Sequence, residues 1–467
     1  MVRLSDNFSA LREPEFRKLF FGQAASIAGT MLTLVALPFA VLAIGGSATD
    51  IGLVEAAYIL PMALMIVVGG VWSDRLPRRM VMLTADVVRA ALQFLAAGLL
   101  LGDVATVWML VVLQVGMGLC DAFFRPAYTG LVPQVVSSAR LQQANALQGL
   151  VQSGSITLGA ATGGLLVAAL GAGWAIGVDG LTFVVSAWFL WRLHPVARAS
   201  VATPVTGMAA TSVADMAGTP VAVAVAPAGP DTAATPGPDV VAPSGVAASE
   251  GQAPVPAIGF LDDLRLGWRE FTSHTWLWVM VSGASVFLFA VEAPLTVLGP
   301  VVARDAYDGA RTWGFLAAAM GLGQIAGGVI ALRWRPRRPF LVLALAMNVT
   351  ALPMAMLATT APPWALFASA AGLGVVWGMF DPFWLTAMQR EVPPDMISRV
   401  SSYDYLGSLA FYPAGLALAG PVSALIGIPA TLWTAAGVSF AVSLFWVSWR
   451  DVRAVHELGP PGLAVTD

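Results

Sequence analysis

Two acidic residues stand alone in long apolar stretches, where an ionisable side chain is costly. Neither Glu55 nor Glu292 has a basic residue within a helical turn or two along the sequence. A carboxyl group in such a stretch marks a polar cavity or a group that takes up and releases a proton. Alternatively, each carboxylate faces an outer vestibule and is only solvated there. Glu292 precedes Pro294, which lets a helix bend, so Glu292 is the first candidate for proton coupling and Glu55 the second.

Two acid–arginine pairs have helical spacing. Asp121 and Arg125 are four residues apart at the expected inner end of the fourth apolar run, and Asp86 and Arg89 are three apart in the third run. Residues at these spacings share a helix face and can pair. A structural role is favoured for both pairs, and the first pair also suits a gate between helices.

Three further acids lie near the ends of apolar runs or within them. Asp50 and Asp179 are expected at outer helix starts, where caps and solvated charges are common. Asp404 either caps or lines the eleventh run.

Several kinds of chemistry are excluded by what the chain lacks. It has one cysteine, Cys120, and its three histidines fall at the ends of apolar runs or in tails, so neither a disulfide nor a metal centre is expected. Lys18 is the only lysine, so there is no phosphate-binding loop and no ATP-driven pump on this chain. The sequence does not bring together a nucleophile and a base, as the active site of an enzyme would require. It also has no basic patch that would indicate binding to nucleic acid. No cofactor is expected.

The composition is that of an integral membrane protein. Apolar residues make up 58% of the chain and charged residues 11%, against about 25% charged in a soluble domain; the mean hydropathy is +0.78. The charges cluster between apolar runs long enough to cross a bilayer as helices. Twelve spans are predicted: 17–43, 51–73, 80–101, 105–125, 142–170, 173–193, 275–302, 312–332, 339–358, 363–388, 400–425 and 428–449.

The arginines predict the orientation of these spans. Outside the spans, all basic residues except Arg304 and Arg311 fall on one side of the membrane, and the positively charged side is the cytoplasmic one. Both termini are therefore expected in the cytoplasm of a multi-pass protein of the cell membrane. The first apolar run follows Arg17 and Lys18 and is too long for a cleavable signal, so it is interpreted as the first span.

The chain divides into two halves around a different kind of segment. Residues 199–258 contain no Lys or Arg and are rich in Ala, Val, Pro, Thr and Gly, a composition that favours a disordered cytoplasmic linker. The predicted domains are a six-helix bundle over 1–198, the linker over 199–258, a second bundle over 259–453 that starts with a short interfacial helix, and a cytoplasmic tail over 454–467.

The two halves resemble each other. Gly118 and Asp121 recur, with the same spacing and an aromatic residue two positions after the acid, as Gly378 and Asp381. Two related six-helix halves are typical of transporters in which one bundle rocks against the other around a central site.

The segment between the second and third spans resembles the signature loop of the major facilitator superfamily, Gly-x3-Asp-Arg-x-Gly-Arg-Arg. The chain has Gly70, Asp74, Arg75, Arg78 and Arg79 in this pattern, with Pro77 in place of the second glycine. Other motifs resemble the branch of enterobactin and macrolide exporters: Phe16 to Leu19 with Gly22 and Gln23, Asp86 with Arg89, Phe124 to Ala127, Gly159 to Gly164, and Asp179 to Phe183. The resemblance implies the major facilitator fold, with a binding site between the halves from spans one, four, seven and ten.

Three positions depart from that branch. Where its members often have Gly-Asp in the first span, this chain has Gly29 and Thr30; the span-four position that is Arg in many proton-coupled drug antiporters is Val112; and Gly159 is followed by Ala160 rather than proline. If protons drive this carrier, another titratable group must move them.

The resemblance also implies a cytoplasmic gate of Asp74, Arg75, Arg78, Asp121 and Arg125. Asp74 would accept hydrogen bonds from the free N–H groups that open span eleven near Ser398 to Ser402, and Arg78 would pair with Asp121. The alternative for the arginines is topology alone. Candidate cavity-lining residues are Gln23, Thr30, Gln114, Trp377, Phe383 and Trp384, although most Trp in such proteins anchor at the interface or pack.

The leading hypothesis is a secondary active transporter that exports a small amphipathic or hydrophobic compound by proton-coupled alternating access. The alternatives are a proton-linked or facilitative uptake carrier and, from a different class, a transporter-like receptor. The expected partners are a small-molecule substrate and the lipid bilayer, with no nucleic acid, and the chain is expected to be a monomer.

Overall fold

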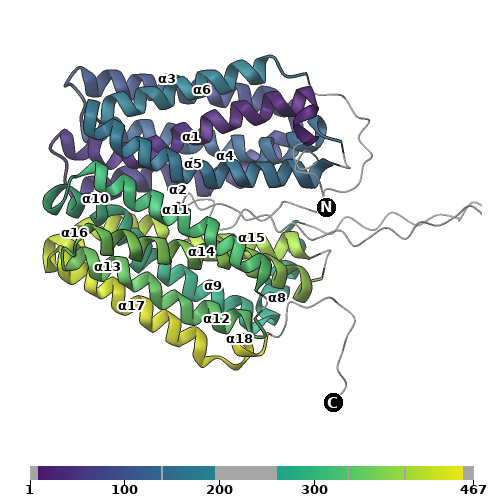
Figure 1. Ribbon diagram of the computed structural model, residues 1–467. Coiled ribbons are helices and arrows are strands. Elements are labelled where there is room, and N and C mark those ends of the chain that lie inside the picture. Colours follow the sequence, from purple (N-terminus) through teal and green to yellow (C-terminus); the bar gives the residue numbers. More distant parts are fainter. Residues whose placement is uncertain (1–8, 138–139, 195–259, 335, 394–395, 456–467) are drawn as a thin grey trace, which may run out of the picture.

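The computed structural model describes residues 9–137, 140–194, 260–334, 336–393 and 396–455. Within these ranges all regular structure is helical, and twelve helical segments are long and apolar enough to cross a membrane. They form two bundles that lie side by side with their helices roughly parallel (Figure 1). The predicted linker over 199–258, and all but the first two residues of the predicted tail, lie outside the described residues.

The N-terminal half contains six long helices after a short 3-10 turn, η1 (Ser9–Arg12). They are α1 (Pro14–Ala43), α2 (Ala48–Arg75), α3 (Arg78–Leu101), α4 (Val107–Val135), α5 (Leu141–Leu170) and α6 (Ala172–Trp191). Ser47 and Asp50 form a reciprocal capping box at the start of α2, as expected for Asp50. The helix α4 continues well beyond the predicted end at residue 125, because Pro126 and Pro133 are accommodated within it.

In the C-terminal half, three of the six spans are interrupted. Span seven consists of α9 (Thr275–Phe287), a π-helical turn η3 (Leu288–Glu292) and α10 (Ala293–Ala306). Span nine has a 3-10 turn, η4 (Met347–Thr350), between α12 (Pro339–Ala346) and α13 (Ala351–Ala358), and span eleven is divided into α15 (Ile397–Leu409) and α16 (Tyr412–Ile426). The remaining helices are α8 (Phe260–Ser273), α11 (Ala310–Arg333), α14 (Pro363–Glu391), α17 (Ile428–Ser448) and α18 (Arg450–Ala454).

The repeated glycines of the two halves have the same packing role. A Cβ on Gly118 of α4 would lie 2.2 Å from the carbonyl oxygen of Tyr58 on α2, and a Cβ on Gly378 of α14 would lie 2.1 Å from that of Gln324 on α11. Only glycine permits such close approach of two helices. The similarity between the halves is therefore a similarity of helix packing: α4 against α2 in one half and α14 against α11 in the other.

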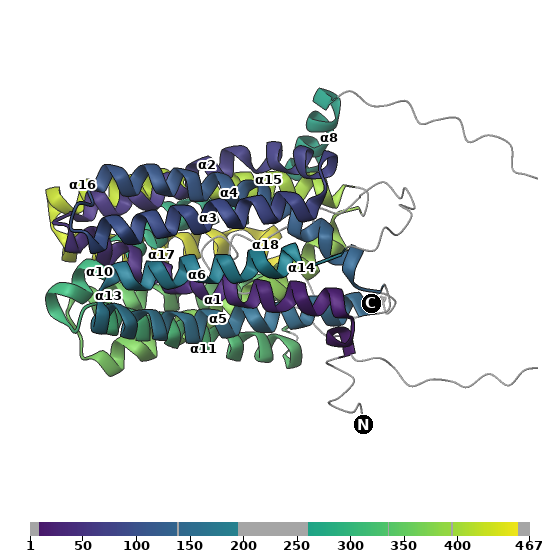
Figure 2. The same ribbon diagram turned by 90° about the horizontal axis from the view of Figure 1, so that it is seen from above.

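The halves contact each other through a limited set of helices. The main contacts between them join α2 to α16 and α10, α5 to α11, and α1 to α10 and α11. The contacts of α2 with α16 lie at the end of the molecule opposite α8, as the α16 and α8 labels in Figures 1 and 2 show. The main contacts of α15, at the other end of span eleven, are with α8, α9 and α16 of its own half.

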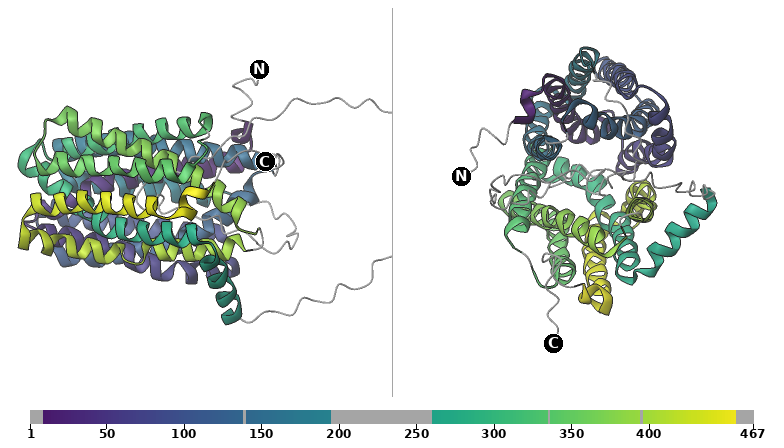
Figure 3. Two further views of the ribbon diagram at one scale, coloured as in Figure 1. Left: turned by 90° about the horizontal axis from the view of Figure 1, so that it is seen from below. Right: turned by 90° about the vertical axis from the view of Figure 1, so that its right-hand side faces the viewer.

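The short helix α8 lies where an interfacial helix is predicted. It crosses the end of the C-terminal half at a steep angle to the spans (Figure 3). The rings of Trp268 and Phe271 pack against Tyr403 of α15, with centroid distances of 5.5 and 6.1 Å. Trp268 and the neighbouring Leu266 remain largely exposed, which suits a helix that lies in the interface between lipid and water.

Candidate functional site

The two isolated acids predicted for proton coupling lie at the contact between the halves. Glu55 is on α2 of the N-terminal half and Glu292 ends the π-helical turn of span seven. Both are buried, and both carboxyl groups lie within electrostatic range of the Tyr412 hydroxyl at the start of α16. Because α2 packs against α16 and α10, the two acids face the same region from opposite halves.

Glu292 occupies a distorted part of its helix. The π-helical turn gives way directly to α10, where Pro294 supplies no backbone N–H. Single π-helical turns are frequent at functional sites. Glu292 is 8% exposed, and its Oε2 is buried without a hydrogen-bond partner. Next to it, the Thr296 hydroxyl donates to the backbone carbonyl of Glu292 at 3.0 Å and lies 3.5 Å from the Tyr412 hydroxyl.

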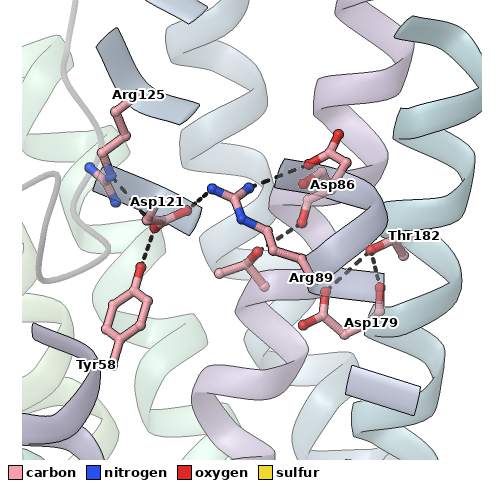
Figure 4. A network of polar contacts seen from close by, with 9 residues as sticks. Tyr58, Asp86, Arg89, Asp121, Arg125, Asp179 and Thr182 are labelled. Atoms are coloured by element: carbon pink, nitrogen blue, oxygen red, sulfur yellow. Dashed lines mark hydrogen bonds and ion pairs between the residues drawn. The ribbon is translucent and has the colours of Figure 1, made fainter. Parts of the chain in front are cut away.

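In the middle of the N-terminal half a charged network joins three helices (Figure 4). Arg89 on α3 forms ion pairs with Asp86 on the same helix, at 3.4 Å, and with Asp121 on α4. The Tyr58 hydroxyl on α2 donates to Asp121, and the Arg89 guanidinium lies 4.2 Å from the centre of the Phe124 ring. Both predicted short-range pairs are present. The network that links them could not be predicted from the sequence, because it depends on how the three helices pack.

Asp121 is predicted at the inner end of span four, and this placement is wrong. Because α4 extends to Val135, Asp121 lies near the middle of the helix. Arg125 remains its neighbour, with Nε 3.6 Å from Asp121 Oδ2. The predicted pair of Asp121 with Arg78 is wrong. Arg78 opens α3 at the end of the bundle and donates to the carbonyl of Gly130 at 2.5 Å, whereas Asp121 is neutralised by Arg89.

Asp179 is not at a helix start. It lies well within α6 and is 1% exposed, so the expectation of a capping or solvated charge is wrong. Its carboxylate accepts hydrogen bonds from the Thr33 hydroxyl at 2.7 Å and the Gln93 amide at 2.5 Å. The predicted span over 173–193 already placed Asp179 inside the helix rather than at its start, and α6 (Ala172–Trp191) confirms that position.

The side chains of Asp74 and Arg75 lie outside those that the structure describes, so the gate that they would form stays a prediction. Arg79, from the same loop, has contacts that topology alone does not require. It donates to the backbone carbonyls of Leu190, at 2.8 Å, and Trp191 at the end of α6. These contacts cap a helix C-terminus, where a cation is favourable.

The candidate cavity-lining residues fall into two groups. Trp377 and Trp384 on α14 line an internal cavity of about 30 Å³ in the C-terminal half, together with Asp404 and Ser408 of α15. Phe383, on the same helix, is buried in the surrounding core. The other candidates, Gln23 and Thr30 on α1 and Gln114 on α4, lie in the N-terminal half.

A second hollow lies in the N-terminal half between α1, α5 and α6. This groove has a volume of about 360 Å³ and is lined mainly by small and aliphatic residues, among them Ala28, Leu32 and Gly159. Its one edge on α6 is Thr182, whose hydroxyl lies 3.2 Å from Asp179 Oδ1. Among the residues that the structure describes, no group of three or more His, Cys, Asp or Glu side chains is arranged to hold a metal ion.

The chain is similar in sequence to a known protein family and to individual proteins within it. The family model described as Major Facilitator Superfamily matches residues 19–409. The multidrug efflux pump Tap of Mycolicibacterium fortuitum is 26% identical over 432 residues, which cover 88% of this chain and 90% of that protein. The putative bacilysin exporter BacE of Bacillus subtilis is 31% identical over 181 residues, 39% of this chain and 44% of that one.

Solved structures show the same fold at low sequence identity. A bacterial homolog of the human lysosomal transporter Spinster, in an inward-facing and unoccupied conformation, has a TM-score of 0.58 at 15% identity and covers 95% of both chains. A bacterial homologue of the iron transporter ferroportin, in an inward-facing state, has a TM-score of 0.57 at 14% identity, with 93% of this chain and 98% of that chain covered.

Proposed function

The chain belongs to the Major Facilitator Superfamily and is therefore a secondary transporter, and we propose that it exports a small amphipathic or hydrophobic compound in exchange for protons. The direction is supported by the relatives, which are named as an efflux pump and an exporter. Identity near 26% does not carry a substrate from one transporter to another, so the proposal is limited to a class of compound.

The observation that carries the proton coupling is the position of Glu292. Among the described residues no Lys, Arg or His forms an ion pair with this buried carboxyl group, and its Oε2 has no hydrogen-bond partner, so a negative charge on it is costly while water is excluded. When the halves rock apart at α2 and α16, water reaches this region and solvates the carboxylate, so that the proton is released. A group that alternates between these environments couples the movement of the halves to the proton gradient.

The electrical part of this driving force is about 2.3 kcal/mol for each charge moved through 100 mV. Glu55 lies across the same contact, on the N-terminal half. It is the reserve candidate, because its helix has no π-helical turn or proline beside the acid.

Everted membrane vesicles test the proposal with ethidium as a fluorescent probe. Vesicles that carry the wild-type chain should accumulate ethidium when their interior is acidified. The Glu292→Gln variant should lose this accumulation and still exchange ethidium down its own concentration gradient. Asp50→Asn, which changes a partly buried acid in the capping box at the start of α2, is the matched control and should behave as wild type. Full pH-driven accumulation by Glu292→Gln would remove this residue from the mechanism.

We also propose that both termini and the linker over 199–258 are cytoplasmic, because the arginines flanking the spans lie almost all on that side. A protease site inserted in the linker should be cut in everted vesicles and resist external protease in intact cells. Cleavage in intact cells would reverse the orientation.

A further inference from the structure

The internal cavity of the C-terminal half combines a buried carboxyl group with aromatic walls. Asp404 projects into it from α15, and Phe287, Trp377, Phe380, Trp384 and Trp446 contribute rings from spans seven, ten and twelve. We propose that this cavity receives the positively charged ammonium group of the transported compound, which makes amphipathic amines the substrate class. This inference rests on the proposed transport function and specifies its substrate.

The Asp404 carboxylate is held in place but not neutralised. The Trp384 indole N–H donates to its Oδ2 at 2.9 Å, and the Ser408 hydroxyl lies 3.5 Å from Oδ1. Among the described residues no Arg, Lys or His forms an ion pair with it, although it is only 9% exposed. By contrast, Asp86 and Asp121 share Arg89. A buried carboxyl group without a cation is poorly stabilised in its ionised form, so a cationic ligand would stabilise the negative charge that burial disfavours here.

The walls suit an organic cation. The Phe380 and Trp384 rings stack with centroids 5.7 Å apart, and Trp377 packs edge-on against Phe380 at 5.8 Å and against Phe287 at 5.9 Å. The faces of such rings attract alkylammonium groups, and aromatic cages are the usual device for their recognition. Trp377, one of the lining residues, also has a buried indole N–H without a hydrogen-bond partner among the described residues.

A metal ion fits this lining poorly. Hard cations such as Ca²⁺ and Mg²⁺ take six or more oxygen ligands, whereas the oxygen-bearing side chains of this cavity are Asp404 and Ser408. Aromatic and methionine side chains supply most of the rest, including Met280 and Met347.

The dimensions limit what enters. A volume of about 30 Å³ accommodates a small head group rather than a whole drug-sized molecule. Ala284 and Phe380 are partly buried, unlike the other lining residues, so they form the part of the cavity that lies nearest the surface of the C-terminal half. In Figure 1, α14 and α15 lie on the side of this half that is turned towards the N-terminal half. The apolar part of an amine would therefore extend from the cavity towards the space between the halves.

Equilibrium binding to the purified full-length chain in lipid nanodiscs tests the inference. The probes are radiolabelled 2-phenylethylammonium and 2-phenylethanol, which have the same ring and chain and differ in the charged group. Wild type should bind the ammonium compound at least about tenfold more tightly than the alcohol, a difference of about 1.4 kcal/mol. Asp404→Asn keeps the size of the side chain and should abolish this preference, while Asp50→Asn should retain it.

A second variant guards against loss of folding in Asp404→Asn. Ala284→Leu leaves the carboxylate in place and fills part of the cavity, so it should weaken binding of both probes by about tenfold or more. Equal affinity of wild type for the two probes, a wild-type preference in Asp404→Asn, or wild-type affinity for both probes in Ala284→Leu would overturn the assignment. Because binding is measured without a gradient, these results are independent of ethidium accumulation, and either proposal can fail while the other stands.

Discussion

The guanidinium of Arg89 on α3 forms an ion pair with the carboxylate of Asp121 on α4 in the buried middle of the N-terminal half, where Arg89 is 4% exposed. The same guanidinium pairs with Asp86, so one arginine serves two acids. Its removal would leave Asp86 buried without a cation, whereas Asp121 would keep Arg125. The network therefore ties α3 to α4 by electrostatics as well as by packing.

Arg89→Met should destabilise the protein by about 3 to 5 kcal/mol, the usual cost of breaking a buried ion pair from one side. Arg125→Met, at a partly exposed position 3.6 Å from Asp121, should cost about 1 kcal/mol or less. Unfolding in mixed detergent micelles measures both. The double variant Arg89→Met with Asp121→Asn should lose less than the two single losses added together; simple additivity would mean that the pair contributes no coupling.

Gly52→Leu should hinder closure of the halves at α2 and α16, because a Cβ at Gly52 would lie 2.0 Å from the carbonyl oxygen of Leu416. Gly98→Leu is the control, since a Cβ there meets nothing within 4 Å. In a Cys120→Ser background, a cysteine at position 48 should react faster with an impermeant maleimide in Gly52→Leu than in Gly98→Leu. Ethidium transport should fall in the same variant. Equal labelling and equal transport in both variants would show that this contact does not control the conformation.

Asp74→Asn should reduce ethidium transport more than Arg79→Ala. Asp74 is predicted to accept hydrogen bonds from the free N–H groups at the start of span eleven. These groups come within hydrogen-bond distance of Asp74 only when the halves close at that end. Arg79, by contrast, donates to the carbonyls of Leu190 and Trp191, so its loss should lower stability by about 1 kcal/mol with a small effect on transport. If Asp74→Asn changes neither transport nor cross-linking between cysteines at the ends of the halves, Asp74 is only a solvated charge.

Glu13 should make stability depend on pH at the start of α1. Burial opposes its ionisation, but hydrogen bonds from Ser137 and the charge of Arg140, 3.2 Å away, outweigh burial and hold the pKa of Glu13 below its ordinary value. A carboxyl group with a lowered pKa stabilises the fold above its unfolded-state pKa, and this contribution is lost as pH falls through the folded-state pKa. Glu13→Gln should therefore melt at a lower temperature than wild type at pH 7, and the difference should shrink as pH falls below about 4. A difference that is constant with pH would assign the effect to packing.

The spans could be predicted because a helix that crosses a bilayer needs a continuous run of mostly apolar residues, and such a run is visible in the sequence. Each observed span overlaps a predicted one, and the largest error is at the end of α4, which continues to Val135 instead of ending at residue 125. The pairs Asp86 with Arg89 and Asp121 with Arg125 were predictable for the same reason, since spacing along one helix fixes which side chains share a face. The isolation of Glu55 and Glu292 from basic residues is likewise visible in the residues themselves.

Partners on different helices are decided only when the helices pack. The sequence alone determined that this chain is a bundle of twelve membrane helices in two related halves. Hydropathy, arginine bias and the repeated Gly and Asp residues can all be identified without knowledge of tertiary contacts. The tertiary structure decided that Asp121 pairs with Arg89 rather than Arg78, that Asp179 is buried against Thr33, and that Asp404 meets Trp384. It also decided the π-helical turn at Glu292. These outcomes depend on the distances and rotations between helices, which come from side-chain packing across the whole bundle.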